Sequence, residues 1–260
     1  MSTVKFTLAA AAAVLLVGSV QAAPVISFGE NQAACATPGV RATCVVSGNP
    51  LTARTTFLSQ LSGGVGTQNF EGFANGAGQN AGLPILFAGS TGNITATVNS
   101  PGNSSVSNGT STGSFTDTEN FGRWNTAPGG GTNWYTAFDS FSIDFDVAIS
   151  AFGFYGTDIG DASGTMQITL LSEAGVSTVL NIPHTVNGAN GSLLFWGFTD
   201  TTTKYTKITF GNTSDGFDGF GFDGMTIGDQ GQVTGAPEPG SLALVGLSLA
   251  ALGIARRRRN

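Results

Sequence analysis

The chain has few charged residues, and basic residues are the scarcest. Asp, Glu, Lys and Arg make up only 10% of its 260 residues, with ten basic residues against sixteen acidic ones. A surface that is acidic and poor in Lys and Arg is repelled by phosphate backbones. The composition therefore disfavours nucleic acid as a partner, and divalent cations are the more natural charged partner.

Residues that commonly carry catalysis are also scarce. The only histidine is His184, and no GxSxG nucleophile motif accompanies it. Hydrolysis of a glycosidic bond needs two carboxylates that flank it, and the spacing of Glu71, Glu119 and Glu173 does not pair them. The sequence predicts no catalytic residue and no certain cofactor.

Long helix-forming side chains are rare, which argues against a helical fold. Gly, Ser, Thr and Asn dominate the polar positions, and 19 Phe residues supply much of the apolar mass. This balance suits short strands joined by many turns. We predict an all-β fold, a two-sheet antiparallel β-sandwich of jelly-roll type, flanked by an N-terminal signal helix and a C-terminal membrane helix.

The second half of the chain has the clearest strand pattern. Apolar and polar residues alternate over 141–149, which predicts a half-buried strand. Phe152 and Phe154 fall on the opposite parity, which indicates a β-bulge near Ala151. Residues 166–170 and 176–182 are predicted to form a hairpin.

The predicted organisation has five parts. A signal peptide covers 1–22, an irregular segment 23–66, the β-sandwich 67–230, a linker 231–236 and a C-terminal signal 237–260. Residues 99–114 hold almost nothing apolar and predict a long flexible loop.

The C-terminal signal has three parts. Pro237, Glu238 and Pro239 form a short extended motif, because each proline fixes φ and biases its predecessor away from helix. Residues 241–255 carry no charge and, as a helix, reach roughly 22 Å against a hydrocarbon core of about 30 Å. The basic residues that follow stay on the cytoplasmic side of a membrane. They are Arg256, Arg257, Arg258 and Arg259.

This tail resembles the PEP-CTERM sorting signal of Gram-negative bacteria. The resemblance implies processing by an exosortase, a membrane-embedded transpeptidase-like enzyme that recognises Pro237, Glu238 and Pro239. It also implies transient anchoring in the inner membrane, then delivery to the cell surface or to an exopolysaccharide matrix such as a biofilm. A GPI signal is disfavoured because its tail normally ends apolar. The remaining alternative is an ordinary C-terminal anchor that is never cut.

The N-terminus agrees with export. Lys5 precedes an apolar run over 6–20, and Val20, Gln21 and Ala22 place a cleavage site after Ala22. Export implies the Sec machinery and signal peptidase as partners, although a first transmembrane helix is the alternative. Between the two signals, five basic residues face fifteen acidic ones, a net charge of −10.

Export also bears on Cys35 and Cys44, the only two cysteines. In an oxidising compartment we predict a disulfide between them. It would close a loop of about ten residues, worth roughly 2.7 kcal/mol in the chain-entropy model. The alternatives are two free thiols or a metal-binding pair, and zinc is disfavoured because no further soft ligand is near.

The body has a resemblance of its own. Segments 69–73, 149–161, 193–198 and 218–228 are similar to a recurring extracellular domain of PEP-CTERM proteins. The likeness covers roughly residues 69–228. It supports the fold and leaves the activity open.

Carboxylates and aromatics are the candidate binding residues of the body. Calcium takes oxygen ligands from Asp-rich loops, which gives a predicted calcium site. Its ligands would be Asp158, Asp161, Asp215, Asp218 and Asp223. Asp is also a common turn residue because its side chain bonds nearby backbone, so a purely structural role is the alternative.

Trp124, Trp134 and Tyr135 lie in a polar, Gly-rich stretch. They form a predicted ligand platform on which a sugar ring could stack. The alternative, which we favour, is that these aromatics cover the core of the sandwich.

Together these features predict a secreted, exosortase-processed protein of the cell surface or extracellular matrix, with a structural or adhesive role and polysaccharide as a partner. The alternative is an extracellular polysaccharide hydrolase or lyase that uses an Asp/Glu pair.

Overall fold

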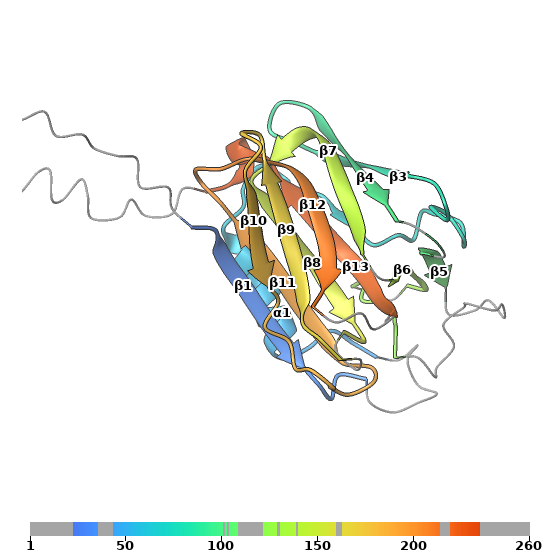
Figure 1. The fold of residues 1–260 in the computed structure, drawn as a ribbon. Helices are drawn as coiled ribbons and strands as arrows, with labels where there is room; N and C mark the ends of the chain where they lie inside the picture. The colour runs from blue at the N-terminus through green and yellow to red at the C-terminus, as the bar shows by residue number, and fades with distance from the viewer. Residues whose placement is uncertain are drawn as a thin grey trace, which may run out of the picture.

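The computed structural model describes residues 23–35, 44–100, 102, 104–108, 122–128, 131–138, 140–159, 163–213 and 219–234. In these residues two antiparallel sheets pack as a β-sandwich, which confirms the predicted sandwich (Figure 1). The predicted signal peptide and the apolar stretch 241–255 lie outside the described residues. Among the described residues, no helix is long and apolar enough to span a bilayer.

One sheet has seven strands. In spatial order they are β1 (Val25–Asn31), β11 (Leu193–Thr199), β8 (Ala151–Thr157), β13 (Gly219–Gly228), β6 (Asn133–Phe138) and β5 (Ser105–Asn108), with β2 (Thr67–Gln68) also paired to β13.

The other sheet has six strands. In spatial order they are β10 (Ser177–Asn181), β9 (Met166–Ser172), β12 (Tyr205–Asn212), β7 (Phe141–Ile149), β4 (Asn93–Asn99) and β3 (Leu83–Ala88). A single α-helix, α1 (Asn49–Ser59), and a short 3₁₀ helix, η2 (Gln230–Gln232), complete the described elements.

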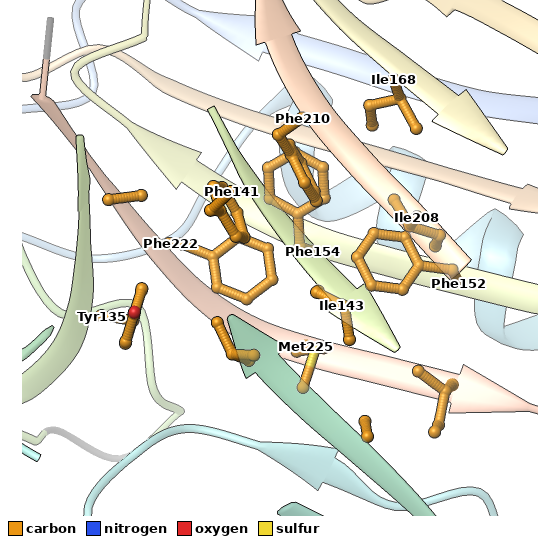
Figure 2. Close-up of a cluster of buried hydrophobic side chains, with 14 of the residues drawn as sticks. Tyr135, Phe141, Ile143, Phe152, Phe154, Ile168, Ile208, Phe210, Phe222 and Met225 are labelled. Carbon is orange, nitrogen blue, oxygen red and sulfur yellow. The ribbon is translucent and has the colours of Figure 1, made fainter. Parts of the chain in front are cut away.

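Phenylalanine rings fill the space between the sheets (Figure 2). Phe141 and Phe210, from the six-stranded sheet, stack with ring centroids 4.2 Å apart. Phe154 and Phe222, from the seven-stranded sheet, lie 5.0 Å apart, and Phe154 meets Phe210 edge-on at 5.3 Å. Burial of each such side chain contributes about 1.5–3 kcal/mol. The Phe-rich composition thus becomes one core shared by both sheets.

The change of parity after Ile149 marks a crossing between the sheets, so the predicted bulge near Ala151 is wrong. β7 ends at Ile149 in the six-stranded sheet, and β8 begins at Ala151 in the seven-stranded sheet. Ser150 between them is fully buried and donates its N–H to Gly228 O. The inward face reverses at this residue because the chain moves to the opposite side of the core.

The segment 23–66 was predicted to be irregular, and this is wrong. It contains β1 and α1. The helix places Pro50, Ala53 and Phe57 on its buried side. Gly153 and Gly197 make room for Phe57, since a Cβ on either would lie 3.0–3.1 Å from its ring. The small residues of β8 and β11 therefore position the helix over the outer face of the seven-stranded sheet.

Two other local predictions are settled by the structure. β9 and β10 form the predicted hairpin, in which Gly175 adopts a positive φ of 76° and donates its N–H to Ser172 O. Part of the predicted flexible loop 99–114 is the strand β5, while residues 109–121 lie outside the described residues.

Candidate functional site

The predicted disulfide between Cys35 and Cys44 is present. Cys35 is buried in a small apolar cluster with Phe57 and Phe195, beside α1. The bond therefore ties the end of β1 to the segment that leads into the helix. Residues 36–43 between the two cysteines lie outside the described residues.

The described chain ends in a segment that is fastened to the body. Val233 pairs with Leu61, Ser62 donates its N–H to Gln232 O at 2.8 Å, and Thr234 donates its N–H to Gln60 O at 2.8 Å. Residues 231–234 are therefore part of the folded body, and the predicted linker 231–236 starts too early.

Asp229 holds this exit segment against both sheets. It follows β13, and its Oδ2 accepts the N–H and the hydroxyl of Ser90 at 2.7 and 2.9 Å. Its backbone N–H and carboxylate also form a reciprocal cap with Gln232. Gln232 in turn donates to Ala88 O at the end of β3. The proline motif begins three residues after Thr234, the last described residue, which is bonded to the body.

Two of the five predicted calcium ligands fall within the described residues, and both contact protein groups. Asp223 on β13 is fully buried. Its Oδ2 accepts the N–H and hydroxyl of Thr126 at 2.7 and 2.9 Å, and its Oδ1 accepts the N–H of Gly224 at 2.7 Å. Burial raises the pKa of Asp223 to about 7, while the bonds from Thr126 and Gly224 lower it and the charge of Glu71 adds to the rise.

Asp158 lies just after β8 with a positive φ of 67°. Its Oδ1 accepts the N–H of Gly191 at 3.2 Å, and its Oδ2 lies 3.9 Å from Nε of Arg123. Gly122 allows this close approach, since a Cβ there would overlap the Asp158 carboxylate. Arg123 and Asp158 are both buried, so the segment 122–128 is held by ionic as well as neutral contacts.

The calcium site stays a prediction. Asp161, Asp215 and Asp218 lie outside the described residues. Within the described part of the chain, no three His, Cys, Asp or Glu side chains are arranged to hold a metal ion.

The residues of the predicted ligand platform are in the interior. Trp124, Trp134 and Tyr135 are 1%, 3% and 0% exposed. Trp124 donates its indole N–H to Gly191 O, and Trp134 donates to the hydroxyl of Thr136. In these positions, no face of the three rings is accessible to a sugar. Their packing agrees with the alternative, that these aromatics cover the core.

The single histidine and the described glutamates also make structural contacts. His184 accepts the N–H of Met166 at Nε2, and its Nδ1 faces Thr185 O, so Nδ1 carries the proton. Glu71 accepts bonds from Asn125 Nδ2 and from the N–H groups of Thr132 and Asn133, at 2.7, 3.0 and 2.9 Å. Glu173 forms an exposed pair with Lys204. The polysaccharide-cleaving alternative stays untested, because Glu119 lies outside the described residues.

The outer side of the six-stranded sheet is mostly polar from β10 to β4, while β3 turns the apolar residues Pro84, Leu86 and Ala88 outwards; single-strand patterns in the sequence did not reveal this surface. We call it the polar sheet face; it consists of the outward residues of β10, β9, β12, β7, β4 and β3. Its central row, in register across five strands, is Val179, Thr169, Thr209, Ser142 and Asn99. A second row is Ser177, Leu171, Lys207, Asp144, Thr97 and Pro84. Neighbouring strands lie about 4.8 Å apart, so the hydroxyl and amide groups of Thr169, Thr209, Ser142 and Asn99 repeat at that spacing.

Charge is nearly absent from this face. The strands of the six-stranded sheet contain only Asp144, Asp146 and Lys207 as charged residues. Lys207 Nζ lies 3.1 Å from Asp144, and Asp146 accepts the N–H of Thr95. In the sequence, this face corresponds to the polar positions that alternate with apolar ones in these strands. Those polar residues are mostly Thr, Ser and Asn.

Residues 236–259 match the family model of the PEP-CTERM protein-sorting motif. The chain carries a PEP-CTERM sorting motif. The match confirms the resemblance predicted for residues 237–260, and it implies an exosortase as the processing partner and export towards the cell surface. No match was found among curated proteins or among solved structures. Pro237, Glu238, Pro239 and the four terminal arginines lie outside the described residues.

Proposed function

We propose that this protein is a structural or adhesive component of the cell surface or extracellular matrix, which an exosortase processes and which binds neutral polysaccharide through its polar sheet face. The observation that carries the proposal is the PEP-CTERM motif at residues 236–259, directly after a body that ends in a fastened segment. The motif supplies the route to the surface. The body supplies what is displayed there.

The chemistry of the polar sheet face suits an uncharged polysaccharide. A sugar chain presents many hydroxyl groups that both donate and accept hydrogen bonds, and the side chains of Thr169, Thr209, Ser142 and Asn99 do the same. Each net hydrogen bond contributes about 0.5–1.5 kcal/mol. A row of weak contacts therefore gives useful binding only when several are made along one chain, as a long polymer allows.

The opposite sheet is a poorer candidate. Its outer side is covered by α1 near β1, β8 and β11, and its strand aromatics are buried except Phe28, which is half-buried. A binding surface on the six-stranded sheet would leave the seven-stranded sheet and the exit segment, which pairs with Gln60, Leu61 and Ser62, free to face the cell.

The binding test is a substitution at the centre of the face. Thr209→Glu places a larger, charged side chain beside Thr169 and Ser142 and removes one hydroxyl; the bulk of the side chain and the cost of desolvating its carboxylate would oppose close contact with an uncharged polymer. Thr56→Glu, on the exposed side of α1, makes the same chemical change away from the face. We expect Thr209→Glu to weaken binding to polysaccharide from the producing cells several-fold in a co-sedimentation assay, with Thr56→Glu unchanged.

Unfolding of both variants must stay close to that of the unsubstituted protein, so that loss of binding is not loss of fold. If both variants bind as the parent does, the polar sheet face is not the binding surface. If the parent shows no binding to any polysaccharide fraction of its cells, the adhesive part of the proposal fails and the sorting part stands.

A further inference from the structure

The six-stranded sheet has one edge with no obvious protection against strand pairing. Natural proteins commonly block sheet edges with proline, charge, bulges or a covering element. At one edge of this sheet, β3 carries Pro84. At the other edge, β10 has the sequence Ser-Thr-Val-Leu-Asn, with neither proline nor charge, and among the described strands it pairs with β9 alone.

Hydrogen bonding with β9 shows which groups of β10 face outwards. Ser172 donates its N–H to Val176 O, and Ile182 donates its N–H to Met166 O. In an antiparallel ladder every second residue pairs with the neighbour, so the even-numbered residues of β10 pair with β9. The backbone N–H and C=O groups of Ser177, Val179 and Asn181 therefore point to the free edge.

These three residues form a register that is complementary to itself. In an antiparallel pairing of two copies centred on Val179, Ser177 of one copy meets Asn181 of the other, and Val179 meets Val179. All the outward backbone groups then find partners. The exposed Val179 side chains, each 56% exposed in the single chain, cover one another on the outer side. Thr178 covers the partly buried Leu180 of the other copy on the inner side.

The distribution of charge also favours a second copy of this chain as the partner of β10. The mature chain carries a net charge of −10, which opposes self-association in general. The stretch from Val176 to Ile182 holds no charged residue, so the two copies can approach along this strand without placing like charges opposite one another.

We propose that β10 is a self-association edge, through which two copies of this protein join their six-stranded sheets into one. The contact is small, because five residues a side bury far less than the roughly 1,600 Å² of a standard interface. It is therefore weak in dilute solution and becomes effective where many copies are held together at a surface. The joined sheets extend the polar sheet face, but pairing does not depend on polysaccharide binding.

The test is cross-linking in the producing cells with the full chain. Residues that form a hydrogen-bonded antiparallel pair have Cα atoms about 5.5 Å apart, within the range that a disulfide spans. Val179→Cys should therefore give a disulfide-linked dimer on a non-reducing gel. The described cysteines are already paired with each other and do not compete. Leu86→Cys is the matched control, because Leu86 is 69% exposed on the opposite edge strand of the same sheet.

We expect several-fold more dimer from Val179→Cys than from Leu86→Cys. Adding Ser177→Pro to Val179→Cys should reduce the dimer, since it removes an N–H that faces the free edge and leaves the β9 ladder intact. Equal dimer from the two cysteine variants would overturn the proposal, and so would a linked species whose mass is not twice that of the chain. Removal of the C-terminal signal changes the mass of each copy. This mass change is distinct from cross-linking and is measured separately on the same gel.

Discussion

Buried carboxylates fasten the loops of this protein. Asp200 accepts the N–H groups of Thr202 and Thr203 at 2.8 and 2.9 Å, and its other oxygen accepts the hydroxyl of Tyr205 at 2.8 Å. Asp223 and Asp229 bind loop residues in the same way. A sequence with few charged residues thus places several of its acidic side chains inside, where each meets N–H and O–H donors.

Asp223 makes stability depend on pH. Its pKa is raised from 3.8 to about 7 in the folded protein by burial, so the folded state holds a proton that the unfolded state has released in this range. The free energy of unfolding should therefore be highest near pH 4 and fall as pH rises to about 7. The fall amounts to a few kcal/mol, because one pKa unit corresponds to about 1.4 kcal/mol.

Urea unfolding at several pH values checks this dependence. Asp223→Asn should flatten the dependence between pH 4 and 7, whereas Glu173→Gln, at an exposed position, should keep it. The expectation is wrong if the unsubstituted protein and Asp223→Asn show the same slope.

At the scale of elements, alternation was the reliable signal. It predicted the strand over 141–149 and the hairpin of β9 and β10. It missed β1, an edge strand whose first two residues are exposed, and α1, whose Thr-rich sequence resembles a strand more than a helix. The helix forms because Phe57 fills the space beside Gly153 and Gly197, a tertiary contact that local sequence does not reveal.

The candidate site was harder to predict than the fold. Trp124 and Trp134 looked like loop aromatics because no strand period surrounds Trp124, and only the packed structure shows that both are buried. The polar sheet face depends on the register of six strands far apart in sequence, which single-strand patterns do not encode.

The packing of α1 can be tested by removing one ring. Phe57→Ala should lower the free energy of unfolding by about 3–5 kcal/mol, because Phe57 is fully buried against Phe195 and leaves a cavity. Leu51→Ala on the same helix, where Leu51 is 44% exposed, should cost much less. Equal losses in urea unfolding would mean that the helix does not stabilise the sheet through this contact.

At the scale of the whole molecule, the sorting tail and the folded body meet at one well-defined place. Asp229 and Gln232 bind the last described residues to both sheets, and Thr234, the last residue that the structure describes, is bonded to the body. Cutting the chain beyond this point removes no contact among the residues that the structure describes. Processing should therefore release a body that keeps its stability.

Mass spectrometry of the C-terminus, in cells with and without the exosortase, tests this division. With the enzyme, the surface fraction should contain the body without the arginine cluster; without it, the full chain should stay in the membrane fraction. Replacing Glu238 by Ala, with the arginines intact, should reproduce the second pattern because the Pro-Glu-Pro motif is what the enzyme is expected to recognise. The Cys35–Cys44 disulfide should form in every case, since it belongs to the body. An intact tail on surface-located protein would show that sorting proceeds without cleavage.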